Sequence, residues 1–357
     1  MARSNEYILT ILLVFSIISL LFINYQTYGP LDVETPTNVV INDGVVKLDS
    51  LTLKQKIAQM VVVTGNPENR DDFNDLLVGG VYFGAMESRD NFNSAISNYE
   101  VNAIIPLFKT IDLEGCWNPF VKFQKFPALK DITSAEQAYN VGYEEGVFMK
   151  SLGVNMDFAP VVDIEDNIWK CRSFTGTLED KSLKISSYIK GLQDAGIIAT
   201  SKHYPGKTLS SNDPHSSLAY ATIGSDDLHL FDVSIGSNVG AIMVSHLLVD
   251  GLVKSGERPA TVSKEVISSL KERYSGLIIS DDAAMLGLKK HYVSKEQMYI
   301  DLFKAGNDIV IDLAIKPKEL DFMLDGVATA VKMGEIPLAQ IDSSVTKILV
   351  AKGLKVE

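Results

Sequence analysis

Cysteine is scarce in this sequence, and runs of basic residues are missing. Only two of the 357 residues are cysteines, Cys116 and Cys171, and neither has a spacing typical of zinc ligands. We therefore expect no metal and no other cofactor. Lys and Arg total 33 against 45 Asp and Glu, for a net charge of -12. Because binding to phosphate backbones needs clustered positive charge, this acidic balance excludes a nucleic-acid partner.

Charge is also missing from residues 7–31. Residues 8–23 are almost wholly apolar, and their number approaches the roughly 20 residues that span a bilayer. No Ala-x-Ala cleavage pattern follows, so we expect residues 1–28 to form an uncleaved transmembrane helix, with a removed signal peptide and a buried core helix as alternatives. Arg3 before the apolar run and acidic residues after it favour an extracytoplasmic location for the remainder. Residues 29–47 resemble a tether.

The remaining residues, 48–357, alternate short β-rich runs with amphipathic stretches. Eight strands, each followed by a helix, predict an α/β protein with a single (β/α)8 TIM barrel, since a doubly wound sheet more often has five to seven strands. Hydroxyl capping predicts helix starts within residues 133–136 and 294–297. The predicted strands are residues 57–63, 80–83, 103–107, 155–159, 197–201, 240–244, 276–279 and 308–311.

The richest polar segment is residues 202–215. Lys202 and His203 leave the fifth predicted strand, and a polar loop then brings in Asp213 and His215. In a TIM barrel, functional residues follow the C-terminal ends of the strands. A carboxylate two residues from an imidazole can fix its tautomer and raise its pKa, which suits general acid and base catalysis.

Two adjacent carboxylates, Asp281 and Asp282, follow the seventh predicted strand. A strand end is a rigid support for a nucleophile or a base. The alternative is a loop carboxylate that caps the next helix. Adjacent residues point in different directions, so we expect only one of the two to face the barrel axis.

Residues 202–215 resemble the Lys-His-Phe-Pro-Gly-His-Gly to Asp-Ser-His signature of glycoside hydrolase family 3, in its single-domain β-N-acetylhexosaminidase branch. The spacing from Lys202 to His215 is the same as in the family. Further motifs similar to those of the family occur in the family's order. They are residues 112–115, 158–163, 172–174, 259–263, 280–285 and 305–308.

The resemblance implies that Asp281 is the nucleophile and that His215 is the acid/base group, oriented by Asp213. A retaining glycosidase needs a carboxylate that forms a glycosyl-enzyme and a second group that moves the proton. A neutral histidine beside Asp281 avoids the repulsion between two carboxylates. The residues implied to hold the sugar hydroxyls are Asp112, Arg172, Lys202 and His203.

Some positions depart from the family pattern. Cys116 stands where the family usually has glycine, and Trp117 stands where arginine is common. Lys207 and Thr208 replace a second histidine and a glycine, and Pro214 should stiffen the loop that carries His215 because proline fixes φ.

The sequence therefore predicts an exo-acting β-N-acetylglucosaminidase that takes a carbohydrate substrate, releasing terminal GlcNAc from cell-wall or other glycans. A β-glucosidase, another β-glycosidase or a phosphorylase of the same family is an alternative. A catalytically silent glycan-binding barrel is another, although the presence of Asp281, Asp213 and His215 together argues against it.

The two cysteines follow the third and fourth predicted strands, whose loops are neighbours in a barrel. In an oxidising compartment they could form a disulfide bond. The alternative is a pair of buried free thiols, because a bond requires the two Cα atoms to lie within about 7 Å.

Overall fold

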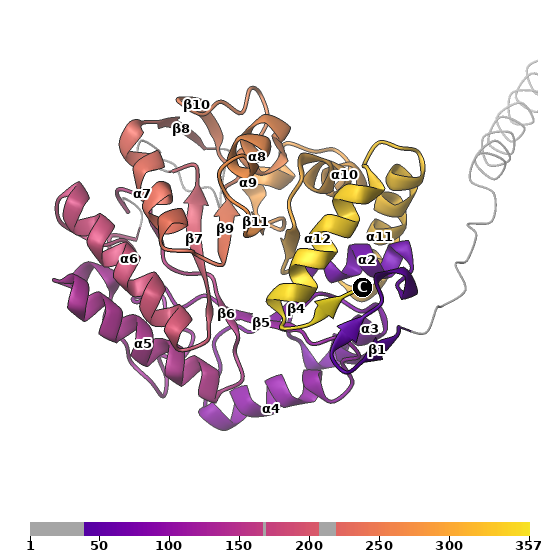
Figure 1. The fold of residues 1–357 in the computed structure, drawn as a ribbon, viewed down its shortest axis with the longest axis horizontal. Helices are drawn as coiled ribbons and strands as arrows, with labels where there is room; N and C mark the ends of the chain where they lie inside the picture. The colour runs from indigo at the N-terminus through magenta and orange to yellow at the C-terminus, as the bar shows by residue number, and fades with distance from the viewer. Residues whose placement is uncertain (1–38, 167–168, 207–218) are drawn as a thin grey trace, which may run out of the picture. The chain divides into compact units, whose positions relative to one another are not determined.

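The computed structural model describes residues 39–166, 169–206 and 219–357, whose central feature is a closed barrel of parallel strands ringed by helices (Figure 1). Neighbouring strands pair in chain order, and the last strand pairs with the first. This arrangement confirms the predicted TIM barrel. The barrel strands are β3 (Val61–Thr64), β4 (Gly80–Tyr82), β5 (Phe108–Ile111), β6 (Met156–Asp157), β7 (Ile198–Tyr204), β9 (Ala241–Val244), β11 (Leu277–Asp282) and β12 (Ile309–Asp312).

Helices lie outside the barrel, and a short two-stranded parallel sheet pairs β8 (Tyr220–Ile223) with β10 (Leu248–Gly251). The helices are α2 (Leu53–Gln59), α3 (Arg70–Asp75), α4 (Arg89–Glu100), α5 (Ala135–Ser151), α6 (Leu178–Asp194), α7 (Ser225–Gly236), α8 (Lys264–Lys271), α9 (Leu286–Lys289), α10 (Lys295–Ala305), α11 (Pro317–Lys332) and α12 (Leu338–Ala351).

Both predicted helix starts are present. Ser294 caps α10 by accepting a hydrogen bond from the Gln297 amide at 3.3 Å, as expected. At α5 the cap is Ser134, which accepts from the Gln137 amide at 3.1 Å, one residue later than the predicted Thr133. A side-chain oxygen in this position satisfies an amide that has no partner within the helix.

The first predicted strand begins too early, and the third is not a strand. The start of the first, residues 57–59, belongs to α2, which Thr52 and Gln55 begin with a capping box. The third, residues 103–107, is the connection between α4 and β5, where Pro106 has no amide hydrogen to donate to a sheet. Strand β5 contains Lys109 and Thr110, so it lacks the continuous apolar run that predicts a barrel strand.

Part of the predicted tether is folded. β1 (Ile41–Asn42) and β2 (Val45–Val46) form an antiparallel hairpin, and β2 also pairs with β13 (Lys355–Val356). Asp43 and Gly44 turn the chain with φ of 50° and 75°, the geometry that favours an Asp-Gly hairpin turn. The folded unit therefore begins at Val39 rather than at residue 48.

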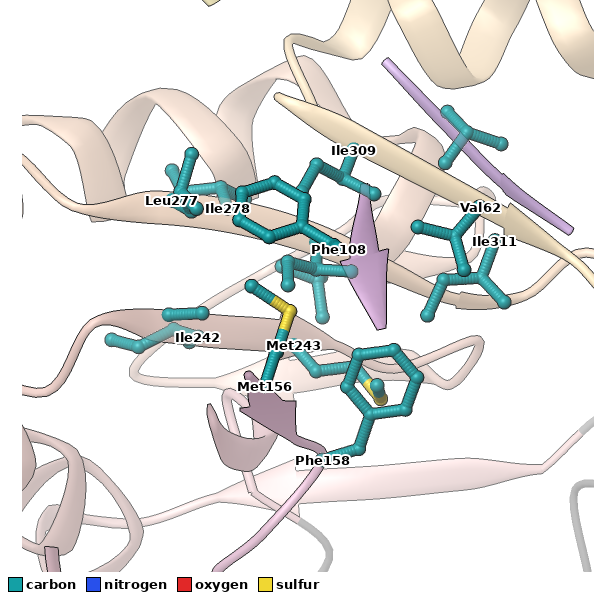
Figure 2. Close-up of a cluster of buried hydrophobic side chains, with 14 of the residues drawn as sticks. Val62, Phe108, Met156, Phe158, Ile242, Met243, Leu277, Ile278, Ile309 and Ile311 are labelled. Carbon is teal, nitrogen blue, oxygen red and sulfur yellow. The ribbon is translucent and has the colours of Figure 1, made fainter. Parts of the chain in front are cut away.

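The barrel interior is filled by apolar side chains from most of its strands (Figure 2). Close packing of this kind leaves little space for a larger side chain at the start of a strand. At Gly79, just before β4, an added Cβ atom would lie 1.8 Å from the carbonyl oxygen of Gln59. The residues labelled in the figure are Val62, Phe108, Met156, Phe158, Ile242, Met243, Leu277, Ile278, Ile309 and Ile311.

The predicted membrane anchor, residues 1–28, lies outside the described residues. Among the helices that the structure does describe, none is both long enough and apolar enough to cross a membrane. The anchor therefore stays a prediction from the sequence.

Candidate active site

A pocket opens at the C-terminal ends of the barrel strands, where a TIM barrel carries its functional residues. All four of the predicted sugar-binding residues and the predicted nucleophile line it. The pocket is lined by Tyr82, Asp112, Glu114, Phe158, Arg172, Lys202, His203, Met243, Asp281, Asp282, Ile311 and Leu313.

Lys202 is the buried cation at the centre of this site. Its side chain, on β7, is 3% exposed, and its ammonium contacts the Asp112 carboxylate and lies 2.5 Å from the Glu114 carboxylate. Burial alone would lower the pKa of Lys202, but the two carboxylates outweigh burial and raise it. Lys202 is therefore charged at every physiological pH.

Glu114 is a site residue that the sequence did not single out, although it lies inside the motif 112–115. The Arg172 guanidinium donates from Nη1 to both of its oxygens, at 3.2 and 3.0 Å. Burial would raise the pKa of Glu114, but Lys202 and Arg172 together lower it. A buried carboxylate held by two cations fixes both in position, so these polar groups of the pocket are set before a ligand arrives.

His203 is held by a second buried carboxylate, Asp163. The His203 ring nitrogen Nδ1 lies 2.9 Å from Asp163 Oδ2, and its backbone amide donates to Oδ1 at 3.1 Å. A carboxylate on Nδ1 fixes the tautomer and the orientation of the ring. Asp163 was part of a recognised motif but was not predicted to be a site residue.

The two adjacent carboxylates at the end of β11 have different surroundings. Asp282 accepts hydrogen bonds on Oδ1 from the amides of Ala284 and Leu313, each at 3.0 Å, so it ties β11 to the end of β12. Burial raises the pKa of Asp282 to about 6, and these two amides offset only part of the effect. Asp281 accepts one amide hydrogen bond, from Asp282 at 2.9 Å, and lies in the pocket.

A third buried carboxyl group supports the floor of the site. Asp157, at the end of β6, is fully buried and accepts a hydrogen bond from the Leu113 amide at 2.9 Å. Burial raises its pKa well above the ordinary value, so we expect it to be neutral. It holds the backbone between Asp112 and Glu114 in place.

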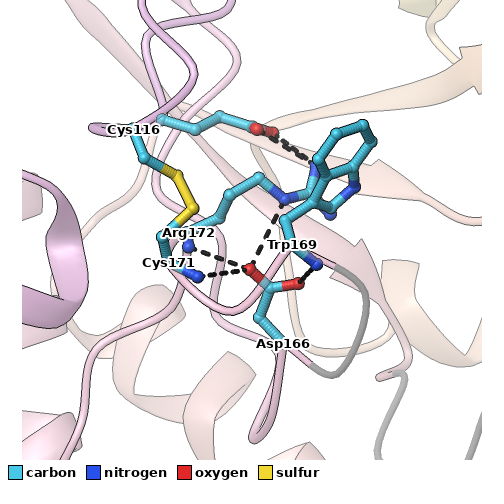
Figure 3. Close-up of a disulfide and its surroundings, with 6 residues drawn as sticks. Cys116, Asp166, Trp169, Cys171 and Arg172 are labelled. Atoms are coloured by element: carbon cyan, nitrogen blue, oxygen red, sulfur yellow. Dashed lines mark hydrogen bonds and ion pairs between the residues drawn. A yellow bond between two sulfur atoms is a disulfide. The ribbon is translucent and has the colours of Figure 1, made fainter.

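The predicted disulfide bond is present. Cys116 and Cys171 are bonded, with their Cα atoms 6.0 Å apart, and they join the loop after β5 to the loop after β6 (Figure 3). The bond lies next to Arg172 in sequence, so it braces the wall that carries this guanidinium. The free-thiol alternative is wrong for this structure.

Removing this bond should destabilise the barrel. The two cysteines are 55 residues apart, and in the chain-entropy model a closed loop of that length contributes about 4 kcal/mol. We expect the double substitution Cys116→Ser and Cys171→Ser to lower the free energy of unfolding in urea by up to this amount. The oxidised protein should show no alkylatable thiol in mass spectrometry; two free thiols in protein purified without reductant would contradict the bond.

The structure does not describe the predicted acid/base pair. Asp213 and His215 belong to residues 207–218, which lie outside the described residues, as do Lys207, Thr208 and Pro214.

Across residues 39–166, 169–206 and 219–357, no three His, Cys, Asp or Glu side chains are grouped to hold a metal ion.

Comparison with known proteins identifies the family. The N-terminal domain of glycosyl hydrolase family 3 matches residues 52–351. The β-hexosaminidase LpqI of Mycobacterium tuberculosis is 26% identical over 351 residues, covering 91% of this chain and 88% of the relative.

Solved structures agree with this match. A family 3 glycosyl hydrolase from Mycobacterium smegmatis has a TM-score of 0.79 at 26% identity, over 87% of this chain and 100% of that chain. A family 3 β-N-acetylglucosaminidase from Paenibacillus has a TM-score of 0.75 at 27% identity, over 85% of this chain and 62% of that chain. With its barrel, its pocket and these relatives, the chain belongs to glycosyl hydrolase family 3 and is a glycoside hydrolase.

Proposed function

We propose that the protein is a retaining exo-β-N-acetylglucosaminidase that releases terminal GlcNAc from glycans, including peptidoglycan fragments. The observation that carries the proposal is the difference between the two carboxylates of β11. Both carboxylates line the pocket, but Asp282 Oδ1 accepts the amides of Ala284 and Leu313, which tie it to the end of β12, whereas Asp281 accepts the amide of its neighbour Asp282. The name of the relative from Mycobacterium tuberculosis supports a β-hexosaminide as the substrate, and that of the relative from Paenibacillus supports GlcNAc as the sugar.

The reaction takes two displacements. In the first, an Asp281 oxygen bonds to the anomeric carbon, the glycosidic bond breaks, and His215 gives its proton to the departing oxygen. In the second, His215 takes a proton from water, the water oxygen bonds to the anomeric carbon, and the bond to Asp281 breaks. Lys202, Asp112, Arg172 and His203 hold the sugar hydroxyls during both steps.

One assay tests the reaction class and the sugar together. The purified protein without residues 1–28 is incubated with nitrophenyl β-glycosides of GlcNAc, glucose and other sugars, with and without phosphate, and the first product is analysed for its anomer. The proposal requires turnover of the GlcNAc glycoside with release of the β-anomer. Preference for glucose, acceleration by phosphate with a sugar phosphate as product, or an α-anomer would overturn it, and no turnover at all would favour a silent barrel.

The role of His215 makes a prediction about leaving groups. His215→Ala should slow substrates with alkyl or sugar leaving groups by at least about a hundredfold more than nitrophenyl substrates in the first step, because only poor leaving groups need strong protonation. Release of the sugar from the enzyme should slow for both. The measurement is kcat/KM over a series of leaving groups, with pre-steady-state detection of the intermediate. An equal loss across the series, with no intermediate accumulated, would count against this role.

We also propose that the barrel is held on the extracytoplasmic face of the membrane by residues 1–28. The support is the apolar run at 8–23 and the charge difference across it. Protease added to intact cells that express the full chain should remove the barrel, and a cytoplasmic protein should survive as the control. Survival of the barrel until lysis would place it inside the cell.

A further inference from the structure

Two exposed tryptophans lie together beside the candidate active site. Trp117 is 51% exposed and Trp169 is 42% exposed, although tryptophan is normally well buried. Their ring centroids are 5.8 Å apart and the rings are inclined by 60°. They are the only tryptophans in the sequence. Large apolar groups gathered at a surface commonly mark a binding site.

Both tryptophans contact residues that line the pocket, Trp117 through its backbone and Trp169 through its ring. The Glu114 amide donates to the Trp117 carbonyl oxygen at 2.9 Å, which closes a tight turn between them. The Trp169 ring lies 5.5 Å from the guanidinium of Arg172, the partner of Glu114 (Figure 3). The aromatic pair therefore continues the wall of the pocket outward.

Several contacts brace the described parts of the two loops that carry the rings. The disulfide bond joins the residue before Trp117 to Cys171. On the second loop, Asp166 accepts hydrogen bonds from the amides of Trp169, Cys171 and Arg172 at 2.9, 3.0 and 2.9 Å. Rings held in place before a ligand arrives lose little conformational entropy on binding, so their contacts contribute more to affinity.

We propose that Trp117 and Trp169 form a subsite for the sugar ring on the leaving-group side of the cleaved bond. The C–H face of a β-linked pyranose is apolar, and its slightly positive hydrogens match the negative face of an indole ring. The terminal sugar would fill the pocket beside Arg172, and the next ring of the chain would rest on the aromatic pair. The substrate is then an oligosaccharide rather than a glycoside with a small alkyl group.

This inference rests on the proposed function, because the leaving-group side is defined by cleavage at Asp281. It can nevertheless be tested without turnover. Trp117 and Trp169 account for all the tryptophan fluorescence of the chain, so that signal reports on this subsite alone. The protein with Asp281→Asn is titrated with N,N′-diacetylchitobiose and, separately, with GlcNAc. We expect a saturable change with the disaccharide and little change with the monosaccharide.

Kinetics give the second readout. Trp117→Ala and Trp169→Ala should each lower kcat/KM for the disaccharide about tenfold, as expected for an aromatic anchor, mainly through KM. The methyl β-glycoside of GlcNAc, which has no second ring, should be cleaved within twofold of the unaltered rate. Trp→Phe at each position should keep most of the activity. Phe322→Ala, an exposed aromatic on α11, is the matched control.

The outcomes separate the two proposals. Hydrolysis of the methyl glycoside without any fluorescence response to the disaccharide would overturn the subsite and leave the proposed function standing. A saturable response without any hydrolysis by the unaltered protein would support sugar binding by the rings and overturn the proposed function. Equal losses on both substrates would assign the rings to structure and overturn the subsite. Tryptophan emission per mole that changes with protein concentration but not with sugar would assign them to self-association and overturn it as well.

Discussion

Asp281→Asn should lower kcat by at least about a thousandfold and leave the fold intact. The amide cannot form the glycosyl-enzyme, whereas sugar binding by the other pocket residues is retained. Asp281 lies at the end of β11 and accepts a hydrogen bond from the Asp282 amide at 2.9 Å, which the side-chain oxygen of an asparagine can also accept, so we expect the fold to be kept. The measurement is steady-state turnover of a GlcNAc glycoside, with circular dichroism and thermal unfolding to verify the fold.

The neighbouring residue supplies the matched control. In Asp282→Asn the side-chain oxygen can still accept from the amides of Ala284 and Leu313. We therefore expect this variant to keep most of its activity. If Asp282→Asn were inactive and Asp281→Asn active, the two carboxylates would have exchanged roles and the proposed mechanism would be wrong.

The buried charges deep in the pocket compensate one another. Asp112 and Glu114 are neutralised by Lys202 and Arg172, whose positions they fix in turn. These pairs are buried, so water screens them little.

The fold could be predicted because most barrel strands are short apolar runs bounded by polar loops. The exceptions show the limit of that signal. Residues 103–107 are more apolar than β5 but contain Pro106 and an exposed Ile104, whereas β5 places Thr110 inside the barrel and carries a lysine. Which polar side chains a barrel interior accepts depends on neighbouring strands, and a single strand's sequence does not contain that information.

The site shows the same limit. The motifs pointed to Asp112, Arg172, Lys202 and His203, and all four line one pocket. Their partners Glu114 and Asp163 lie in the same motifs, yet nothing local says which carboxylate faces which cation. The pair of Arg172 and Glu114 is separated by 58 residues, and that of His203 and Asp163 by 40. Only the closed barrel brings these residues together.

Lys202→Met should cause a loss of stability that grows with pH. The change leaves Asp112 and Glu114 buried with Arg172 as their remaining cation, and breaking a buried ion pair typically costs about 3–5 kcal/mol. In the unaltered protein the lowered pKa of Glu114 stabilises the fold above the pKa of the unfolded chain, and this contribution disappears as the pH falls through the folded value. Sugar binding should be lost at the same time.

In the variant the sign reverses for Glu114. Burial already raises the pKa of Asp112 to about 6 in the unaltered protein, with Lys202 opposing the shift. Without the ammonium, burial raises the pKa of both carboxyl groups further, so the folded state holds protons that the unfolded chain releases, and stability falls as the pH rises through the raised values. Urea unfolding from pH 5 to pH 8 should therefore show a widening gap between Lys202→Met and the unaltered protein. Lys190→Met removes a cation that is 64% exposed and paired with Asp194, so it should leave stability nearly unchanged, with little pH trend, because water screens an exposed pair. If the difference in free energy of unfolding between Lys202→Met and the unaltered protein stayed constant or narrowed toward pH 8, the Lys202 ammonium would not be what keeps the two carboxylates ionised.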